Sequence, residues 1–100
     1  MQRAHAIANG VYVAAANRIG YEAEPGTDGV EFFGRSFISD PFGKVMLEAP
    51  GDADAVLVAA CSRAHLEGVR RSWPFLRDRR VDAYGGIMAR FLDGQGLVEN

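Results

Sequence analysis

Two continuous apolar runs constrain the fold of this chain more than any other feature of its sequence. Residues 11–16 (VYVAAA) and 53–61 (ADAVLVAAC) lack the regular alternation of a half-exposed strand. Such runs are typical of strands that are buried on both faces, although the alanines of the first run leave a helix as an alternative. Strands of this kind need a covering layer on each side, and the rest of the chain offers little to cover them.

Helix and turn signals surround the first run. A helix is predicted at the N-terminus, where an apolar face recurs with helical spacing and Asn9-Gly10 provides a stop. Its apolar face consists of Ala4, Ile7, Ala8 and Val11. Residues 20–29 (GYEAEPGTDG) are predicted to form an exposed loop, because Gly, Pro and acidic residues dominate them. A hairpin is predicted over 37–47, around a type I turn at residues 40–43 (DPFG).

A second helix follows the second apolar run. Ser62 is its predicted N-cap, Leu66, Val69 and Trp73 lie on its apolar side, and Pro74 ends it. Residues from Phe75 onward are predicted to form an extended or partly helical tail. The order helix, strand, hairpin, strand, helix and tail indicates an α/β layered fold with antiparallel pairs. One hundred residues correspond to one small domain or to a piece of a larger one.

Charge and composition exclude several classes of protein. Eleven basic and thirteen acidic residues give a net charge of −2, which argues against a dedicated nucleic-acid binder. A single cysteine excludes an internal disulfide framework and fits a reducing compartment. No apolar run approaches the roughly 20 residues that span a membrane, and residues 1–10 lack the apolar region of a signal peptide. We therefore expect a cytoplasmic protein without a membrane partner.

Candidate catalytic groups are few. His5, His65 and Cys61 have no ligand-type spacing, so no metal site is predicted. Cys61 precedes a helix N-terminus and is a formal candidate nucleophile, but a small buried residue at a strand end is the favoured interpretation. A catalytic triad could formally be assembled from Ser36, His5 and Asp40. Nothing in the sequence requires it, and no nucleophile elbow is present. Lys44, the only lysine, does not open a helix, so no phosphate loop is predicted.

The densest charge feature is the segment from Arg63 to Arg80, which holds six of the ten arginines and is interleaved with Trp73 and Phe75. A basic nucleic-acid patch is one interpretation. Arg and Trp are also enriched at protein contacts, and Asp78 interrupts the positive run. Pairing within the chain or between subunits is therefore favoured.

Three strings, in order, resemble the C-terminal part of the nitrilase, or carbon–nitrogen hydrolase, superfamily. They are residues 3–22 (RAHAIANGVYVAAANRIGYE), 32–45 (FFGRSFISDPFGKV) and 70–84 (RRSWPFLRDRRVDAY). The third is similar to the N-carbamoylputrescine amidase branch in particular. The resemblance covers nearly the whole chain and weakens after Tyr84. It implies that residues 1–100 are the C-terminal segment of such a domain, with a tail from about residue 75.

The resemblance implies a fold and a chemistry. The fold is an α-β-β-α sandwich, of which this chain would be the C-terminal part. The chemistry is hydrolysis of C–N bonds by a Cys nucleophile, a Glu base and a Lys that stabilises the oxyanion, without a cofactor. The implied reaction converts N-carbamoylputrescine and water to putrescine, CO2 and ammonia, a step of polyamine biosynthesis. All three catalytic residues precede the matched region, so neither Cys61 nor Lys44 inherits a catalytic role.

Site residues of two kinds follow from the resemblance. Asn17 and Ser36 are candidates for the wall of the substrate pocket. The candidates for an oligomer contact are Trp73, Phe75, Arg77, Arg79, Arg80 and Tyr84. The family's Arg-Arg-Pro-Asp-Leu-Tyr is changed here to RRVDAY over residues 79–84, which removes a proline that would fix the backbone. The expected partners are a small carbamoyl amine, further copies of the chain, or a complementary N-terminal chain.

Two alternatives to an N-carbamoylputrescine amidase segment stay open. The first is a non-catalytic remnant or interaction module, and the second is a segment of another amidase of the superfamily. On every one of these alternatives the 100-residue chain alone is expected to be inactive.

Overall fold

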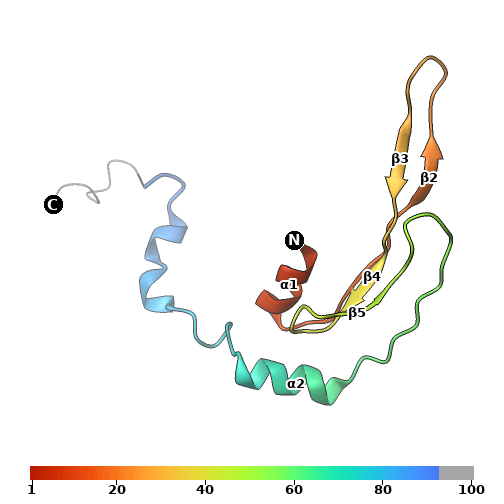
Figure 1. The fold of residues 1–100 in the computed structure, drawn as a ribbon. Helices are drawn as coiled ribbons and strands as arrows, with labels where there is room; N and C mark the ends of the chain where they lie inside the picture. Colours follow the sequence, from red (N-terminus) through yellow and green to blue (C-terminus); the bar gives the residue numbers. More distant parts are fainter. Residues whose placement is uncertain (93–100) are drawn as a thin grey trace.

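Helix α1 (Gln2–Asn9) opens the computed structural model, which describes residues 1–92 of the chain (Figure 1). The predicted stop is confirmed, because Gly10 is left-handed with a φ of 59° and its N–H bonds back to the helix. Glycine adopts this conformation without a steric penalty. The apolar run after it forms strand β1 (Val13–Ala15), so the predicted strand is confirmed. Its predicted burial on both faces is wrong, because Ala14 and Ala16 are exposed.

The predicted hairpin is also confirmed. Strands β4 (Phe37–Ser39) and β5 (Val45–Glu48) pair antiparallel, and β1 pairs with the other edge of β4 to give the sheet order β1-β4-β5. The turn closes through a hydrogen bond of 2.9 Å from the Gly43 N–H to the Asp40 carbonyl. The Asp40 side chain accepts two more backbone N–H groups, those of Phe42 and Lys44. Asp at the first turn position therefore fixes the hairpin as its sequence indicates.

A second hairpin corrects the predicted loop over residues 20–29. Strands β2 (Ile19–Glu22) and β3 (Val30–Phe33) pair antiparallel, so only residues 23–29 form the connection. Bulky residues opposite each other stabilise the pairing, as at Ile19 and Phe33. The predicted exposure is confirmed for residues 20–28. The hairpin projects from the rest of the molecule (Figure 1).

The predicted buried strand over residues 53–61 is wrong for this structure. The segment is extended but belongs to no sheet, and Val56 and Val58 are 90% and 83% exposed. No backbone hydrogen bond joins these residues to any other part of the described chain. A strand needs a neighbour to satisfy its backbone groups, and none of the five strands lies alongside this one. Figure 1 shows the segment as a long arc between β5 and the second helix.

Helix α2 (Arg63–Ser72) follows the extended segment, and its predicted N-cap is confirmed. The Ser62 hydroxyl accepts the His65 N–H at 3.1 Å. Beyond the helix, the tail contains two short 3-10 helices, η1 (Val81–Ala83) and η2 (Gly85–Met88), which agrees with a partly helical tail. Residues 93–100 of the predicted tail lie outside the described residues.

The core is very small. The buried apolar side chains of the described residues are Ala6, Pro41, Ala49 and Val69. The radius of gyration is 20.8 Å, against about 13 Å for a compact domain of 100 residues. The mixed helical and antiparallel architecture is thus present without the layers that would cover it.

Candidate functional site

The two predicted pocket-wall residues lie together at the junction between the sheets. Asn17 follows β1 and Ser36 precedes β4, and the Ser36 hydroxyl accepts the Asn17 N–H at 2.8 Å. The same hydroxyl lies 3.3 Å from the Asn17 carbonyl oxygen, to which it donates. Together the two bonds fix the backbone at the junction. The Asn17 side chain is left exposed and makes no hydrogen bond within residues 1–92.

Glycine and arginine backbone conformations shape the same junction. Gly34 has a φ of 65°, and a Cβ at this position would lie 2.5 Å from the Ile19 side chain and 3.2 Å from the backbone of Gly51. The backbone of Gly51 therefore approaches Gly34 closely, which a side chain at this position would prevent. Arg35 also has a positive φ, of 57°, which is uncommon for a residue with a side chain. The chain therefore reverses sharply just before Ser36.

The structure does not assemble the triad of Ser36, His5 and Asp40. Asp40 instead faces His65, whose Nε2 lies 3.4 Å from the Asp40 Oδ2. Burial alone would raise the pKa of Asp40, but the backbone N–H groups of Lys44 and Phe42, together with His65, lower it below its ordinary value. The His65 ring packs against Phe42 and Tyr12, with centroid distances of 6.0 and 6.4 Å. This cluster joins α2 to the turn of the β4–β5 hairpin and has no nucleophile in it.

Cys61 is exposed, so the expectation of a buried residue at a strand end is wrong. The thiol is uncovered because the segment that carries it has no neighbouring strand. No base contacts it within the described part of the chain. Lys44 is exposed on the hairpin turn, and residues 1–92 hold no group of three side chains that could bind a metal ion. No helix among these residues is long and apolar enough to cross a membrane.

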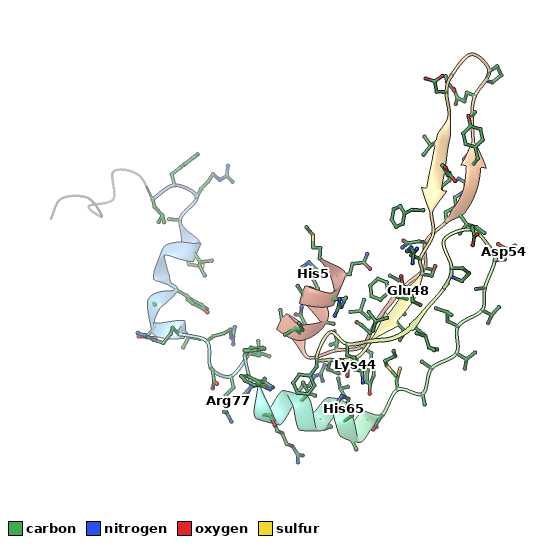
Figure 2. The ribbon with its side chains drawn as sticks, viewed as in Figure 1. His5, Lys44, Glu48, Asp54, His65 and Arg77 are labelled. Carbon is green, nitrogen blue, oxygen red and sulfur yellow. The ribbon has the colours of Figure 1, made fainter. Side chains whose placement is uncertain are left out.

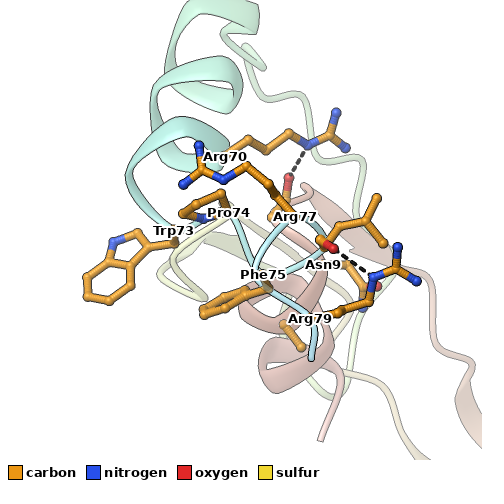
Figure 3. A pocket seen from close by; sticks show the side chains of 10 residues that line it. Asn9, Arg70, Trp73, Pro74, Phe75, Arg77 and Arg79 are labelled. Carbon is orange, nitrogen blue, oxygen red and sulfur yellow. Dashed lines mark hydrogen bonds between the residues drawn. The ribbon is translucent and has the colours of Figure 1, made fainter. Parts of the chain in front are cut away.

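The predicted oligomer-contact residues lie mostly around one open cavity of about 700 Å³ between the end of α1 and the residues after α2 (Figure 3). The cavity is lined by Trp73, Phe75, Arg77 and Arg79, together with Arg70, which was not among the predicted contact residues. The Arg70 Nε donates to the Gly10 carbonyl at 3.0 Å. The apolar face of α2 and the glycine that ends α1 were the available signals for this contact.

Arg80 and Tyr84 lie outside that cavity. Arg80 forms a two-pronged pair with Asp82, at 2.9 and 2.7 Å. This hydrogen-bonded pair raises the pKa of Arg80 and lowers the pKa of Asp82. Part of the predicted charge pairing is therefore within the chain.

A second, smaller cavity of about 210 Å³ is almost wholly apolar. Its position next to the hairpin turn was not foreseen from the sequence, although Phe42 in the turn was a signal. Figure 2 places His65 and Lys44 in the same region, where α2 meets the turn. Its lining residues are Ile7, Pro41, Phe42, Val69, Trp73 and Phe75.

Comparisons with protein families, with curated proteins and with solved structures agree with one another. The model of the carbon–nitrogen hydrolase family matches residues 1–71. N-carbamoylputrescine amidase of Arabidopsis thaliana is 41% identical over 97 residues, which cover 94% of this chain and 32% of that protein. Citrullinase of Francisella tularensis is 34% identical over 91 residues, covering 91% of this chain and 32% of the relative.

A solved structure shows the same likeness in three dimensions. The crystal structure of a carbon–nitrogen hydrolase from Helicobacter pylori G27 superposes with a TM-score of 0.78 at 41% identity. The superposition covers 91% of this chain and 32% of that structure. The chain therefore spans about a third of the length of the proteins it matches.

Proposed function

Because the chain belongs to the carbon–nitrogen hydrolase family, we propose that it forms the C-terminal part of an amidohydrolase that resembles N-carbamoylputrescine amidase. The observation that carries the proposal is the 41% identity to the Arabidopsis amidase over 94% of the chain. A match of that extent includes the Arg-rich residues 72–84, which lie beyond the family model and resemble this branch. The proposed reaction converts N-carbamoylputrescine and water to putrescine, CO2 and ammonia.

The catalytic Cys, Glu and Lys of the family belong, in this proposal, to polypeptide that precedes the matched region. The geometry of the described residues supports this division, because Cys61 has no base beside it and Lys44 lies on an exposed turn. Attack by a thiol on a carbamoyl carbon requires a base within hydrogen-bond reach and a donor for the oxyanion. The chain alone is therefore expected to be inactive, and no cofactor is part of the proposal.

An α-β-β-α sandwich is the proposed fold of the complete domain. Support comes from residues 53–61, which are extended, apolar and without a neighbouring strand. Within the sandwich this segment would pair with strands of the preceding polypeptide, which would cover Val56 and Val58. The partner is then either the same protein's N-terminal part or a complementary N-terminal chain, and we place the assembly in the cytoplasm.

The junction of Asn17 and Ser36 is proposed to support the wall of the substrate pocket. Its two hydrogen bonds hold the backbone while the Asn17 side chain stays free to contact a ligand. Residues Trp73 to Tyr84 are proposed to build an oligomer contact, since exposed Trp, Phe and Arg are typical of protein interfaces.

Ammonia release from N-carbamoylputrescine tests the proposal. The assay compares the chain alone, its Cys61→Ser variant, and the chain mixed with a complementing polypeptide, meaning the portion of an N-carbamoylputrescine amidase that carries the family's Cys, Glu and Lys. Only the mixture is expected to release ammonia, and a mixture made with the Cys61→Ser variant is expected to release it as well. Turnover by the isolated chain that disappears in Cys61→Ser would overturn the proposal.

A non-catalytic interaction module is the second candidate, and the exposed segment 53–61 favours it equally well. The same assay separates the two. The complementing polypeptide must carry the family's Cys, Glu and Lys unchanged. If the mixture then forms a stable complex but releases no ammonia, the result would support an interaction module and contradict the amidase proposal.

A further inference from the structure

The two ends of this molecule carry opposite charge. The β2–β3 hairpin has four acidic residues and no basic residue between Ile19 and Gly34. These acids are Glu22, Glu24, Asp28 and Glu31. The segment from Arg63 to Arg80 carries six arginines against Glu67 and Asp78. Figure 1 shows the hairpin and the residues after α2 at opposite ends of a molecule that is 58 Å long.

The acidic tip of the hairpin is already ordered. The Tyr21 hydroxyl bonds to the Asp28 carbonyl, and the Thr27 N–H and hydroxyl both bond to the Glu24 carbonyl, at 3.1 and 2.8 Å. The carboxylates of Glu24, Asp28 and Glu31 make no hydrogen bond or ion pair within residues 1–92. An ordered tip with free carboxylates loses little conformational entropy when it binds.

The arginines around the large cavity are positioned to receive carboxylates. Arg70, Arg77 and Arg79 each use Nε for a hydrogen bond, to the Gly10 carbonyl, the Asp78 carboxylate and the Leu76 carbonyl. Each bond holds its guanidinium group in place, and Figure 3 draws those of Arg70 and Arg79. Their terminal amino groups make no hydrogen bond to any described residue. A fixed guanidinium with free terminal N–H groups binds a carboxylate through two parallel hydrogen bonds.

No described acidic residue lines the cavity; Arg77 pairs with Asp78 outside the lining, while Arg70 and Arg79 lack a counter-charge among residues 1–92. The hairpin of the same chain cannot supply one, because it lies at the other end of the molecule (Figure 1). A second copy can. Trp73 and Phe75, with centroids 6.3 Å apart, offer the cavity an apolar surface, and Pro25 is the apolar residue between the two acids of the tip.

We propose that the Arg-lined cavity receives the acidic tip of the β2–β3 hairpin from a second copy of this chain. Since each copy carries both surfaces at opposite ends, two copies related by a two-fold axis make the contact twice. The pairing is electrostatic, so it weakens as salt screens the charges. It concerns surfaces that the proposed hydrolysis does not use, and its failure would leave the amidohydrolase proposal standing.

Charge exchange between the two surfaces tests the contact. One variant, Glu24→Lys with Asp28→Lys, makes the tip basic, and the other, Arg77→Glu with Arg79→Glu, makes the cavity acidic. Each variant alone places like charges at both contacts, whereas an equimolar mixture restores opposite charges at both. The changed side chains are exposed, so the fold is retained. Asp52→Lys with Asp54→Lys is the matched control for the tip variant, since it makes the same change in charge away from both surfaces.

Sedimentation velocity at low ionic strength measures the association. The dimer dissociation constant of each charge-exchange variant is expected to rise by about tenfold or more, while the mixture recovers the value of the native chain and the control is unchanged. The native dimer is expected to dissociate as salt is raised. If the copies associated through residues 53–61 instead, neither the charge exchange nor the salt concentration would change the dissociation constant. Equal dissociation constants for the native chain and both variants would overturn the proposal. So would a mixture that associates no more tightly than either variant by itself.

Discussion

The Tyr12 hydroxyl bonds to both backbone polar groups of Ser62, fifty positions later in the chain. It accepts the Ser62 N–H at 2.9 Å and donates to the Ser62 carbonyl at 3.1 Å. The contact attaches the N-terminus of α2 to the residue that precedes β1. It also holds one end of the extended segment 53–61 in place, although no other part of residues 1–92 pairs with the segment itself.

Tyr12→Phe should therefore destabilise the chain while preserving the aromatic ring. Two hydrogen bonds are lost, and the exposed Ser62 groups can bond to water instead, so we expect a loss of about 1 kcal/mol in the free energy of unfolding. Urea denaturation measures it. Tyr84→Phe, whose hydroxyl has no partner within residues 1–92, is the control and should change nothing.

Ser62→Ala tests the helix cap separately. Loss of the hydroxyl leaves the His65 N–H without its acceptor, and we expect about 1 kcal/mol of destabilisation with reduced helical circular dichroism. Ser72→Ala, at the other end of α2, removes a hydroxyl that caps nothing. Equal effects of the two substitutions would contradict the assigned cap.

Gly34→Ala should damage the junction that positions Ser36. A Cβ would overlap Ile19, and the φ of 65° is unfavourable for alanine. Gly20→Ala is the matched comparison, since Gly20 has a φ of 98° and no atom within 4 Å of the added Cβ. Both variants place a Cβ at a positive φ, but only Gly34→Ala adds a clash, so we expect Gly34→Ala to be the less stable of the two by about 1–3 kcal/mol. Similar melting curves would show that the junction is looser than described.

Asp40 gives the chain an acid-dependent stability. Its folded pKa is lower than the ordinary 3.8, so the charged form stabilises the fold above that pH, and the contribution is lost as the pH falls through the folded pKa. Unfolding free energies measured from pH 6 to about pH 2 should fall more steeply for the native chain than for Asp40→Asn. Asp54→Asn, which removes an exposed and unpaired carboxylate, should keep the native profile.

Local signals predicted the local structure well. Asn9-Gly10, the DPFG turn and Ser62 each act through bonds with near neighbours in sequence, so their consequences could be predicted without a tertiary fold. The β2–β3 hairpin was missed because Gly, Pro and acidic residues marked 20–29 as a loop, while its stability depends on cross-strand neighbours such as Ile19 and Phe33.

Long-range features could not be predicted in the same way. The run 53–61 has the composition of a buried strand, but pairing and burial depend on neighbours that the described residues do not supply. Cys61 is exposed for the same reason. Asn17 and Ser36 were proposed from resemblance, and the structure adds the two bonds that join them. The cavity at Arg70 depends on a contact between residues sixty positions apart.

Backbone hydrogen exchange over residues 53–61 tests the central claim most directly, namely that this segment is a strand of a larger domain. In the chain alone its amides should exchange rapidly, while those of β4 are protected by neighbours on both sides. On addition of the complementing polypeptide, protection should appear at residues 53–61 as amidase activity appears. Protection of these amides in the isolated chain, or an active complex in which they still exchange rapidly, would contradict the claim.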